Sequence, residues 1–181
     1  RWLSDWSSDV CSSDLVELRE ELIKAGHRFA SQTDTEVIPH LLEDYYQGDL
    51  EAAMRKVLGR IHGSYAIVAM TESEPDRLVV ARKDSPLIIG LGQGENLIAS
   101  DIPAVLSHTK KTYILDDGEV AVVTRDRVQV TDVAGNPVDK QIYEVKWDPE
   151  AAEKGGYEHF MLKEINEQPR AIRDTLTGRI L

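Results

Sequence analysis

The stretch DLEAAMRKVLGRIHGSYAIVAM, residues 49–70, contains a change of hydrophobic period that decides the fold class. In its first half, apolar side chains recur at spacings of three and four residues from Leu50 to Ile61, which predicts an amphipathic helix. Gly63 stands at the expected end of that helix. Residues 64–70 are of the types enriched in strands. The sequence therefore predicts a helix that ends immediately before a strand.

Two further helices are predicted before this stretch. Residues 16–26 carry a helical apolar face and end at a glycine. Thr33 and Glu36 have the spacing of a capping box, in which two side chains satisfy the free amides at a helix start. The helix that follows extends over residues 37–45, and residues 47–49 are expected to end it and to cap the next helix.

After this stretch the sequence predicts a series of short strands joined by turns. Turns are expected at residues 74–76, in the glycine-rich segment 90–94, at 117–118 and at 134–137, and the last three are interpreted as hairpins. The strands are predicted at residues 77–81, 87–89, 96–99, 112–115, 119–123, 128–133 and 140–145. Short connections favour antiparallel pairing. Helices first and strands afterwards predict an α+β fold with mostly antiparallel strands.

The glycine-rich segment 90–94 has a second interpretation, a loop that binds phosphate. Phosphate loops point their backbone amides at the anion from the N-terminus of a helix. Here the glycines lead into residues 95–98, which are predicted to form a strand. We therefore expect a tight hairpin.

Composition excludes several classes of function. The chain of 181 residues has a formal net charge of −11, which argues against binding to a nucleic-acid backbone. No apolar run approaches the length of a membrane span, so no membrane interaction is expected. The single cysteine, Cys11, fits a reducing compartment, and we expect a cytoplasmic protein of one domain.

The first residues, RWLSDWSSDVCSSDL (1–15), differ in composition from the rest of the chain. They lack the basic start and apolar core of a signal peptide. We interpret them as a non-native leader; the alternative is a disordered native tail. Nothing near Cys11 in the sequence would lower the pKa of its thiol, so it is a poor candidate for a nucleophile.

The histidines show no spacing typical of a metal site, and no cysteine accompanies them. No G-x-S-x-G nucleophile motif is present. We therefore expect no metal site and no cofactor. The histidines in question are His27, His40, His62, His108 and His159.

Asp34 is the one candidate binding residue. An aspartate at the start of a helix commonly serves the cap and the helix dipole. Alternatively, its carboxylate binds the ammonium group of a ligand through a charge-assisted hydrogen bond. The residue pattern alone leaves both interpretations open.

The segment SQTDTEVI, residues 31–38, resembles the S-x-T-D-T-E-V motif of class II glutamine amidotransferases. In that family the aspartate of the motif holds the α-amino group of glutamine, which implies this role for Asp34. Thr33 and Glu36 are then expected to support its loop and helix. Further matches occur in the family's order, so the resemblance covers residues 16–180. These further matches lie at residues 18–22, 63–66, 81–87 and 92–101.

Residues 159–180, HFMLKEINEQPRAIRDTLTGRI, narrow the resemblance. They resemble the segment that joins the glutaminase domain to the sugar-phosphate isomerase domain in the glutamine–fructose-6-phosphate aminotransferase family. Helix-forming composition extends from Tyr157 to Glu167. Pro169 is expected to stop or kink this helix near Gln168.

The resemblance implies an N-terminal-nucleophile αββα sandwich, present in part. Residues 16–150 would be the C-terminal part of a type 2 glutamine amidotransferase domain. Residues 151–181 would be a helix and linker toward a sugar isomerase domain that the sequence does not include. The implied enzyme forms glucosamine-6-phosphate from fructose-6-phosphate and glutamine, with fructose-6-phosphate bound only in that other domain, and it is a homodimer.

The family's catalytic residues are not found in these 181 residues. The nucleophile of the family is a cysteine at the first position of the mature chain, whose own α-amine acts as base. A later R-W-A-T-H-G stretch and an N-G pair complete that site, and neither occurs here. We therefore expect this polypeptide by itself to be inactive. The alternatives are the glutaminase domain of another class II amidotransferase, such as the purine-pathway enzyme, and a non-catalytic module with this fold.

Overall fold

The computed structural model describes residues 13–146 and 155–176 of the chain. The chain divides into two compact units, Arg1–Val145 and Lys146–Leu181, and each is described by itself. Most of the predicted leader (1–15), including Cys11, lies outside the described residues. None of the helices in the described ranges is long and apolar enough to cross a membrane.

The first unit begins with three α-helices, as the sequence predicts. They are α1 (Ser13–Ala25), α2 (Val37–Tyr45) and α3 (Leu50–Leu58), and a 3-10 turn, η1 (Asp34–Glu36), leads into α2. Asp49 caps α3, because its carboxylate accepts hydrogen bonds from the amides of Glu51 at 3.0 Å and Ala52 at 3.3 Å. This cap confirms the expected break before α3.

Helix α1 starts earlier than expected, at Ser13 and not at Val16. Leu15 is the reason, since its side chain is only 1% exposed and belongs to the core beneath the helices. The composition of residues 1–15 conceals this contact from a sequence prediction. The buried side of the helix therefore extends into the segment that we interpret as a leader.

One four-stranded antiparallel sheet packs against these helices. Its strands are β1 (Tyr65–Thr71), β2 (Glu74–Lys83), β6 (Glu119–Thr124) and β7 (Val128–Asp132), in the order β1-β2-β6-β7. Residue pairs such as Ile67 with Ala81 set the register between β1 and β2. The turn predicted at residues 74–76 is wrong, because these residues already lie in β2. The pairing of β1 with β2 is antiparallel as expected.

The second sheet is also antiparallel and has the order β4-β3-β5-β8. Its strands are β3 (Ile88–Leu91), β4 (Asn96–Ala99), β5 (Lys111–Ile114) and β8 (Tyr143–Glu144). Strands β3 and β4 form the hairpin expected from the glycine-rich segment. A Cβ at Gly92 would lie 2.7 Å from the Glu95 carbonyl oxygen, and Gly94 has φ +71°. Both glycines serve the turn, which confirms the hairpin interpretation.

The hairpin predicted at residues 117–118 is wrong, and the one predicted at residues 134–137 forms with a different strand partner than expected. Residues 117–118 do not pair β5 with β6, since β5 belongs to the second sheet and β6 to the first. Residues 134–137 do turn the chain back along β7, through an antiparallel bridge between Thr131 and Pro137 and a hydrogen bond from the Val138 amide to the Val130 carbonyl oxygen at 2.9 Å, but the strand that follows, β8, belongs to the second sheet. Gly118 has φ +77°, so the expected turn chemistry is present, but it turns the chain between layers. Turn residues specify a local change of direction and leave the choice of partner strand to the core.

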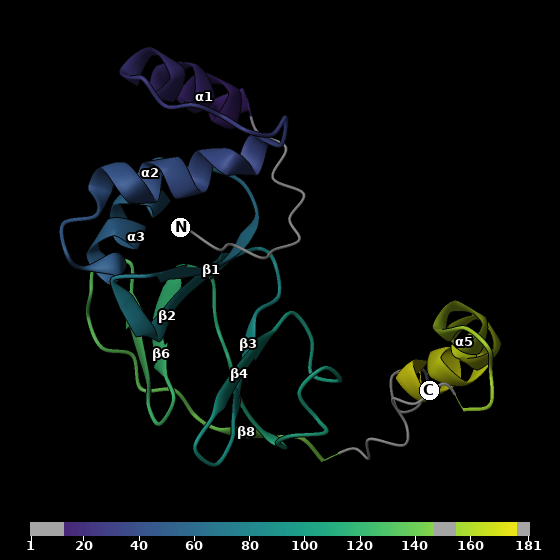
Figure 1. The fold of residues 1–181 in the computed structure, drawn as a ribbon. Coiled ribbons are helices and arrows are strands. Elements are labelled where there is room, and N and C mark those ends of the chain that lie inside the picture. Colours follow the sequence, from purple (N-terminus) through teal and green to yellow (C-terminus); the bar gives the residue numbers. More distant parts are fainter. Residues whose placement is uncertain (1–12, 147–154, 177–181) are drawn as a thin grey trace. The chain divides into compact units, whose positions relative to one another are not determined.

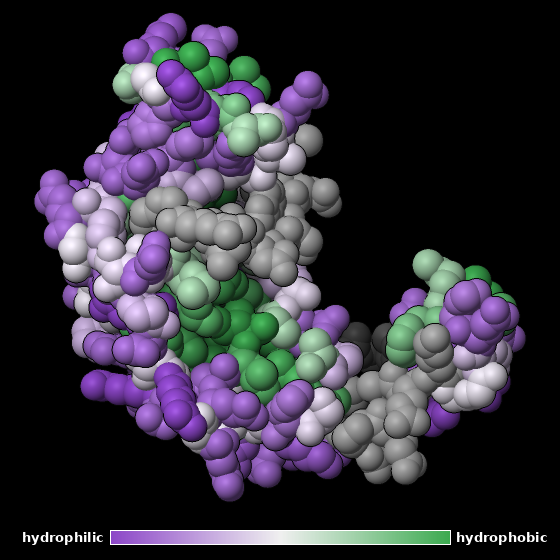
Figure 2. All heavy atoms as spheres, viewed as in Figure 1, coloured by the Kyte–Doolittle hydropathy of each residue, from purple (hydrophilic) through white to green (hydrophobic). Residues whose placement is uncertain are grey.

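The first unit therefore has three layers: helices, sheet, sheet (Figure 1). Alternate residues of the first sheet face opposite sides. Ile67, Val79 and Val120 join the core with the helices. Val80 and Ala121 join a second core between the two sheets. Figure 2 shows apolar side chains gathered on the face over β1–β4. This arrangement confirms the α+β class with antiparallel strands.

The second unit contains one described helix, α5 (Phe160–Leu176). The sequence predicts that Pro169 stops or kinks this helix; α5 continues through Pro169, so the expected stop near Gln168 is wrong. A proline removes one amide donor, and the helix-forming residues on both sides of Pro169 tolerate that loss here. Residues 177–180 of the linker-like segment lie outside the described residues. Among the α5 residues whose side chains are described, the large apolar ones that are more than a third exposed are Phe160, Met161, Leu162, Ile165 and Ile172.

Candidate functional site

The loop between α1 and η1 leads directly into the candidate binding residue, Asp34. The carboxylate of Glu36 holds this loop in place. Glu36 accepts hydrogen bonds from the amide of Ala30 at 2.6 Å and from the amide of Ser31 at 2.7 Å. The Ser31 hydroxyl donates a third bond to Glu36 at 2.6 Å. These bonds, the Ser31 hydroxyl first among them, lower the pKa of Glu36 from 4.5 to about 2. Glu36 is therefore an ionised anchor for the loop.

The capping box predicted for Thr33 and Glu36 does not form. Thr33 precedes η1, yet its side chain makes no capping hydrogen bond. Its hydroxyl lies 2.7 Å from the Ser31 hydroxyl. The Glu36 carboxylate reaches past Thr33 to the loop, because Ala30 and Ser31 offer it two free amides. The prediction of a capping box is wrong, whereas the expectation that Glu36 supports the loop is confirmed.

Arg19 of α1 holds the same loop from the other side. Its guanidinium donates to the carbonyl oxygens of Ser31 at 2.7 Å and Thr33 at 3.1 Å. It also lies 4.3 Å above the ring of Phe29, within the range of a cation–π contact. Sequence reasoning missed Arg19, because its partners are backbone atoms that no side-chain motif reveals.

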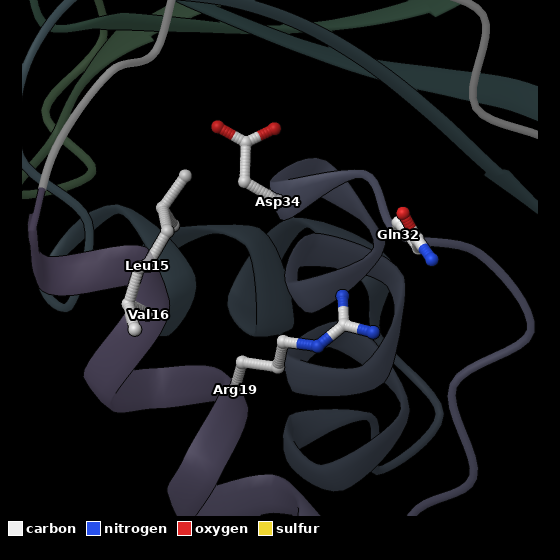
Figure 3. A pocket seen from close by; sticks show the side chains of 5 residues that line it. All are labelled: Leu15, Val16, Arg19, Gln32 and Asp34. Carbon is white, nitrogen blue, oxygen red and sulfur yellow. The ribbon is translucent and has the colours of Figure 1, made fainter.

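Asp34 is the first residue of η1, directly after this loop, and its side chain is exposed. It lines a hollow of about 290 Å³ together with Leu15, Val16, Arg19 and Gln32. Figure 3 shows the Asp34 carboxylate extending away from the helix below it, on the side toward which Leu15 also extends. Within residues 13–146 and 155–176, no donor is paired with this carboxylate.

This geometry suits a small ligand that carries a positive charge. A carboxylate without a protein partner can accept two or more charge-assisted hydrogen bonds from an ammonium group. Val16, which is 58% exposed and also lines the hollow, adds apolar surface for the carbon chain of such a ligand. The glutamine-binding role of Asp34 stays a prediction at this point. Cys11, the weak nucleophile candidate, lies outside the described residues.

The structure brings together two histidines that are scattered in the sequence. His27 follows α1, His40 lies on α2, and their Nδ1 atoms are 3.1 Å apart. No spacing rule could have found this pair, because thirteen positions and a loop separate its members. His108 lies elsewhere, with its Nδ1 3.7 Å from Glu95. His159 belongs to the second unit, 3.7 Å from Glu158.

Comparison with known proteins identifies a family of domains and a set of relatives that this chain resembles. The family described as "Glutamine amidotransferase domain" matches residues 12–107. A glutamine–fructose-6-phosphate aminotransferase (isomerizing) of Caldanaerobacter subterraneus is 58% identical over 166 residues, 92% of this chain. Enzymes of the same name from Clostridium tetani and Clostridium perfringens are 54% and 56% identical. The chain spans about 27% of the length of each of these relatives.

Solved structures share the fold at low sequence identity. A glutamine phosphoribosylpyrophosphate amidotransferase from B. subtilis, complexed with ADP and GMP, matches with a TM-score of 0.58 and 22% identity. The match covers 76% of this chain and 29% of that one. An allosteric regulatory enzyme of purine biosynthesis matches with a TM-score of 0.57 over 75% of this chain and 28% of its own. These likenesses support the N-terminal-nucleophile type of sandwich expected from the sequence. From the match over residues 12–107, which include Asp34 and its loop, the chain belongs to the family of glutamine amidotransferase domains.

Proposed function

We propose that this chain is part of an enzyme that takes the amide nitrogen of glutamine and transfers it to fructose-6-phosphate, forming glucosamine-6-phosphate. The observation that carries the proposal is the Asp34 carboxylate, which lies in a hollow without a described protein partner. In this proposal Asp34 binds the α-ammonium group of glutamine. Glu36 and Arg19 fix the loop before it, so that the carboxylate is oriented before the substrate arrives.

The choice of acceptor depends on the sequence relatives. Identity of 54–58% over more than 90% of this chain links it to glutamine–fructose-6-phosphate aminotransferases. The two solved structures are 22% identical to this chain, which supports a shared fold alone. Fructose-6-phosphate is therefore favoured over the purine-pathway acceptor. The sugar phosphate would bind in the family's isomerase domain, outside these 181 residues.

We also propose the cellular setting and assembly that the family implies. Glutamine and fructose-6-phosphate are small polar metabolites, and the whole enzyme would act on them in the cytoplasm. It would be a homodimer through the sugar isomerase domain. Sedimentation of a whole enzyme that contains residues 16–180 of this chain tests the dimer, and a monomer at micromolar concentration would contradict it.

A segment exchange tests the proposed reaction. Residues 16–180 of this chain would replace the matching segment of the C. subterraneus relative, and formation of glucosamine-6-phosphate would be measured. The exchange is needed because the R-W-A-T-H-G stretch of the family does not occur in these 181 residues. We expect the hybrid enzyme to make glucosamine-6-phosphate from glutamine at a rate within about tenfold of the parent. A folded hybrid that makes none would overturn the proposal.

A further inference from the structure

Two imidazole rings converge beside the loop that precedes Asp34. The Nδ1 atoms of His27 and His40 are 3.1 Å apart, and the two rings meet edge to face with an interplanar angle of 74°. Two nitrogen atoms at this separation can both lie about 2.0–2.1 Å from one ion, with an angle of roughly 95–100° at the metal. That angle is close to the tetrahedral arrangement that Zn²⁺ prefers.

The outer nitrogen of each ring faces a carboxylate. His27 Nε2 lies 3.0 Å from Asp44 Oδ1, and His40 Nε2 lies 3.7 Å from Glu36 Oε1. Histidines that bind metals commonly donate their second N–H to a carboxylate, which fixes the tautomer and makes the ligating nitrogen more basic. Asp44 would therefore place the His27 proton on Nε2 and leave the His27 Nδ1 lone pair free, whereas His40 Nε2 is too far from Glu36 for a hydrogen bond, so the His40 proton can lie on either ring nitrogen.

A metal ion would remove the repulsion that arises when both rings carry their proton on Nε2. If both rings carry their proton on Nε2, two Nδ1 lone pairs face each other at 3.1 Å and repel. With the His40 proton on Nδ1, that N–H donates to His27 Nδ1 and no cation is needed; with both protons on Nε2, the pair needs a cation between the rings. That cation is either an additional proton, which makes one ring an imidazolium, or a metal ion. A shared proton needs only the two nitrogen atoms, whereas a metal ion needs further ligands.

Glu43 is positioned to supply a third ligand for a metal ion. One of its carboxylate oxygens lies within 4.8 Å of a nitrogen atom of each histidine, and Oε2 is 3.9 Å from His40 Nδ1. The Glu43 side chain is 60% exposed, so it can rotate toward the ion at little cost. His27 and His40 are only 15% and 17% exposed, which holds the two nitrogen ligands in place.

We propose that His27 and His40, through their Nδ1 atoms, and Glu43, through a carboxylate oxygen, bind a Zn²⁺ ion, with water in the fourth position. Two imidazoles and one carboxylate are a ligand set that suits Zn²⁺ and similar transition-metal ions. The ion would join the segment after α1 to α2, beside Glu36. Its role would be structural support of the loop that precedes Asp34. The proposal is independent of the proposed reaction.

Zinc binding by the whole 181-residue chain tests the proposal. The protein would be prepared without a histidine tag, with the Cys11→Ser substitution to remove the thiol, and titrated with Zn²⁺ against a chromophoric chelator. We expect one Zn²⁺ per chain with micromolar or tighter affinity. Co²⁺ in its place should show the intense visible bands of a tetrahedral site. Acid should weaken binding, because Zn²⁺ competes with protons for imidazoles that face Glu36, Glu43 and Asp44.

Conservative variants assign the ligands without relying on an unfolded protein. His27→Gln and His40→Gln should each weaken Zn²⁺ binding by about 100-fold or more, since loss of a second-layer partner alone costs about 10–100-fold. Asp44→Asn should weaken Zn²⁺ binding by about 10–100-fold. Glu43→Gln changes only an exposed side chain and should weaken binding by at least about tenfold. Circular dichroism confirms that each variant is folded.

His108→Gln is the matched control. His108 is also a histidine beside a carboxylate, at 3.7 Å from Glu95, but its side chain is 51% exposed and it has no second imidazole in the described cluster. Its substitution should leave Zn²⁺ binding unchanged. The proposal is overturned if the folded chain binds no stoichiometric Zn²⁺, or if Glu43→Gln and His40→Gln bind it as tightly as the parent. Either result would assign the pair to a shared proton.

Discussion

Glu36 holds Ser31 by two hydrogen bonds, one from the backbone amide at 2.7 Å and one from the hydroxyl at 2.6 Å. The same carboxylate lies 3.7 Å from His40 Nε2. Glu36 thus connects the loop before Asp34 with the histidine pair. A change in the charge of Glu36 is therefore expected to affect both the loop and the histidine pair.

Acidification should release this anchor. The pKa of Glu36 is about 2 in the folded chain and 4.5 in the unfolded chain. A carboxylate whose pKa is lowered by folding contributes stability that is fully present above the unfolded value and lost as the pH falls through the folded value. Glu36→Gln should therefore reduce the free energy of unfolding by about 1–2 kcal/mol at pH 7, and this deficit should shrink between pH 4.5 and pH 2. Urea unfolding at several pH values measures the difference.

The control for this series is Glu20→Gln, which changes an exposed carboxylate of α1. This substitution should change the free energy of unfolding by close to zero at every pH of the series. A Glu36→Gln deficit that stays constant across the whole acid range would show that the carboxylate's charge does not hold the loop.

Arg19 should matter for glutamine binding although it need not contact glutamine. Replacing it with lysine keeps the positive charge but removes the planar fork that reaches the carbonyls of Ser31 and Thr33. In the hybrid enzyme, Arg19→Lys should raise the KM for glutamine by about tenfold, because the loop before Asp34 loses its fixed position. The KM for fructose-6-phosphate should stay the same. Equal rises in both would point to general destabilisation.

Gly92 should be intolerant of a side chain. A Cβ at this position would meet the Glu95 carbonyl oxygen at 2.7 Å, so Gly92→Ala should lower the free energy of unfolding by about 1–3 kcal/mol. Gly59→Ala is the comparison, because its Cβ would have ordinary contacts, the nearest at 3.4 Å. Urea unfolding of the two variants should separate them clearly. Equal stability would mean that the β3–β4 turn adapts.

Sequence reasoning succeeded where local pattern and burial coincide. The periods of three and four predicted α2 and α3, and the strand-like residues 64–70 matched β1. It failed where the outcome depends on distant parts of the chain. The turn at residues 117–118 has the expected chemistry, but the choice between two sheets depends on which faces the core buries.

The candidate site shows the same division. The motif around Asp34 could be recognised because its residues are consecutive. Arg19 could not, since it binds backbone carbonyls of a loop that the fold brings to it. The pairing of His27 with His40 depends on how the segment after α1 passes α2, which neither residue's neighbours encode. Leu15 was misjudged because the composition around it masked a buried helical position.

In the proposed enzyme, Asp34 is the group that recognises the α-ammonium of glutamine. The direct measurement compares glutamine with glutaramate, which lacks the α-amino group, as substrates of the hybrid enzyme with Asp34 intact and with the Asp34→Asn substitution. The intact hybrid should prefer glutamine by about 30-fold or more in kcat/KM, and Asp34→Asn should abolish most of that preference, consistent with about 2–3 kcal/mol for a charge-assisted bond. Asp76→Asn, at an exposed position of β2, should leave the preference intact. An undiminished preference for glutamine in Asp34→Asn would contradict the account.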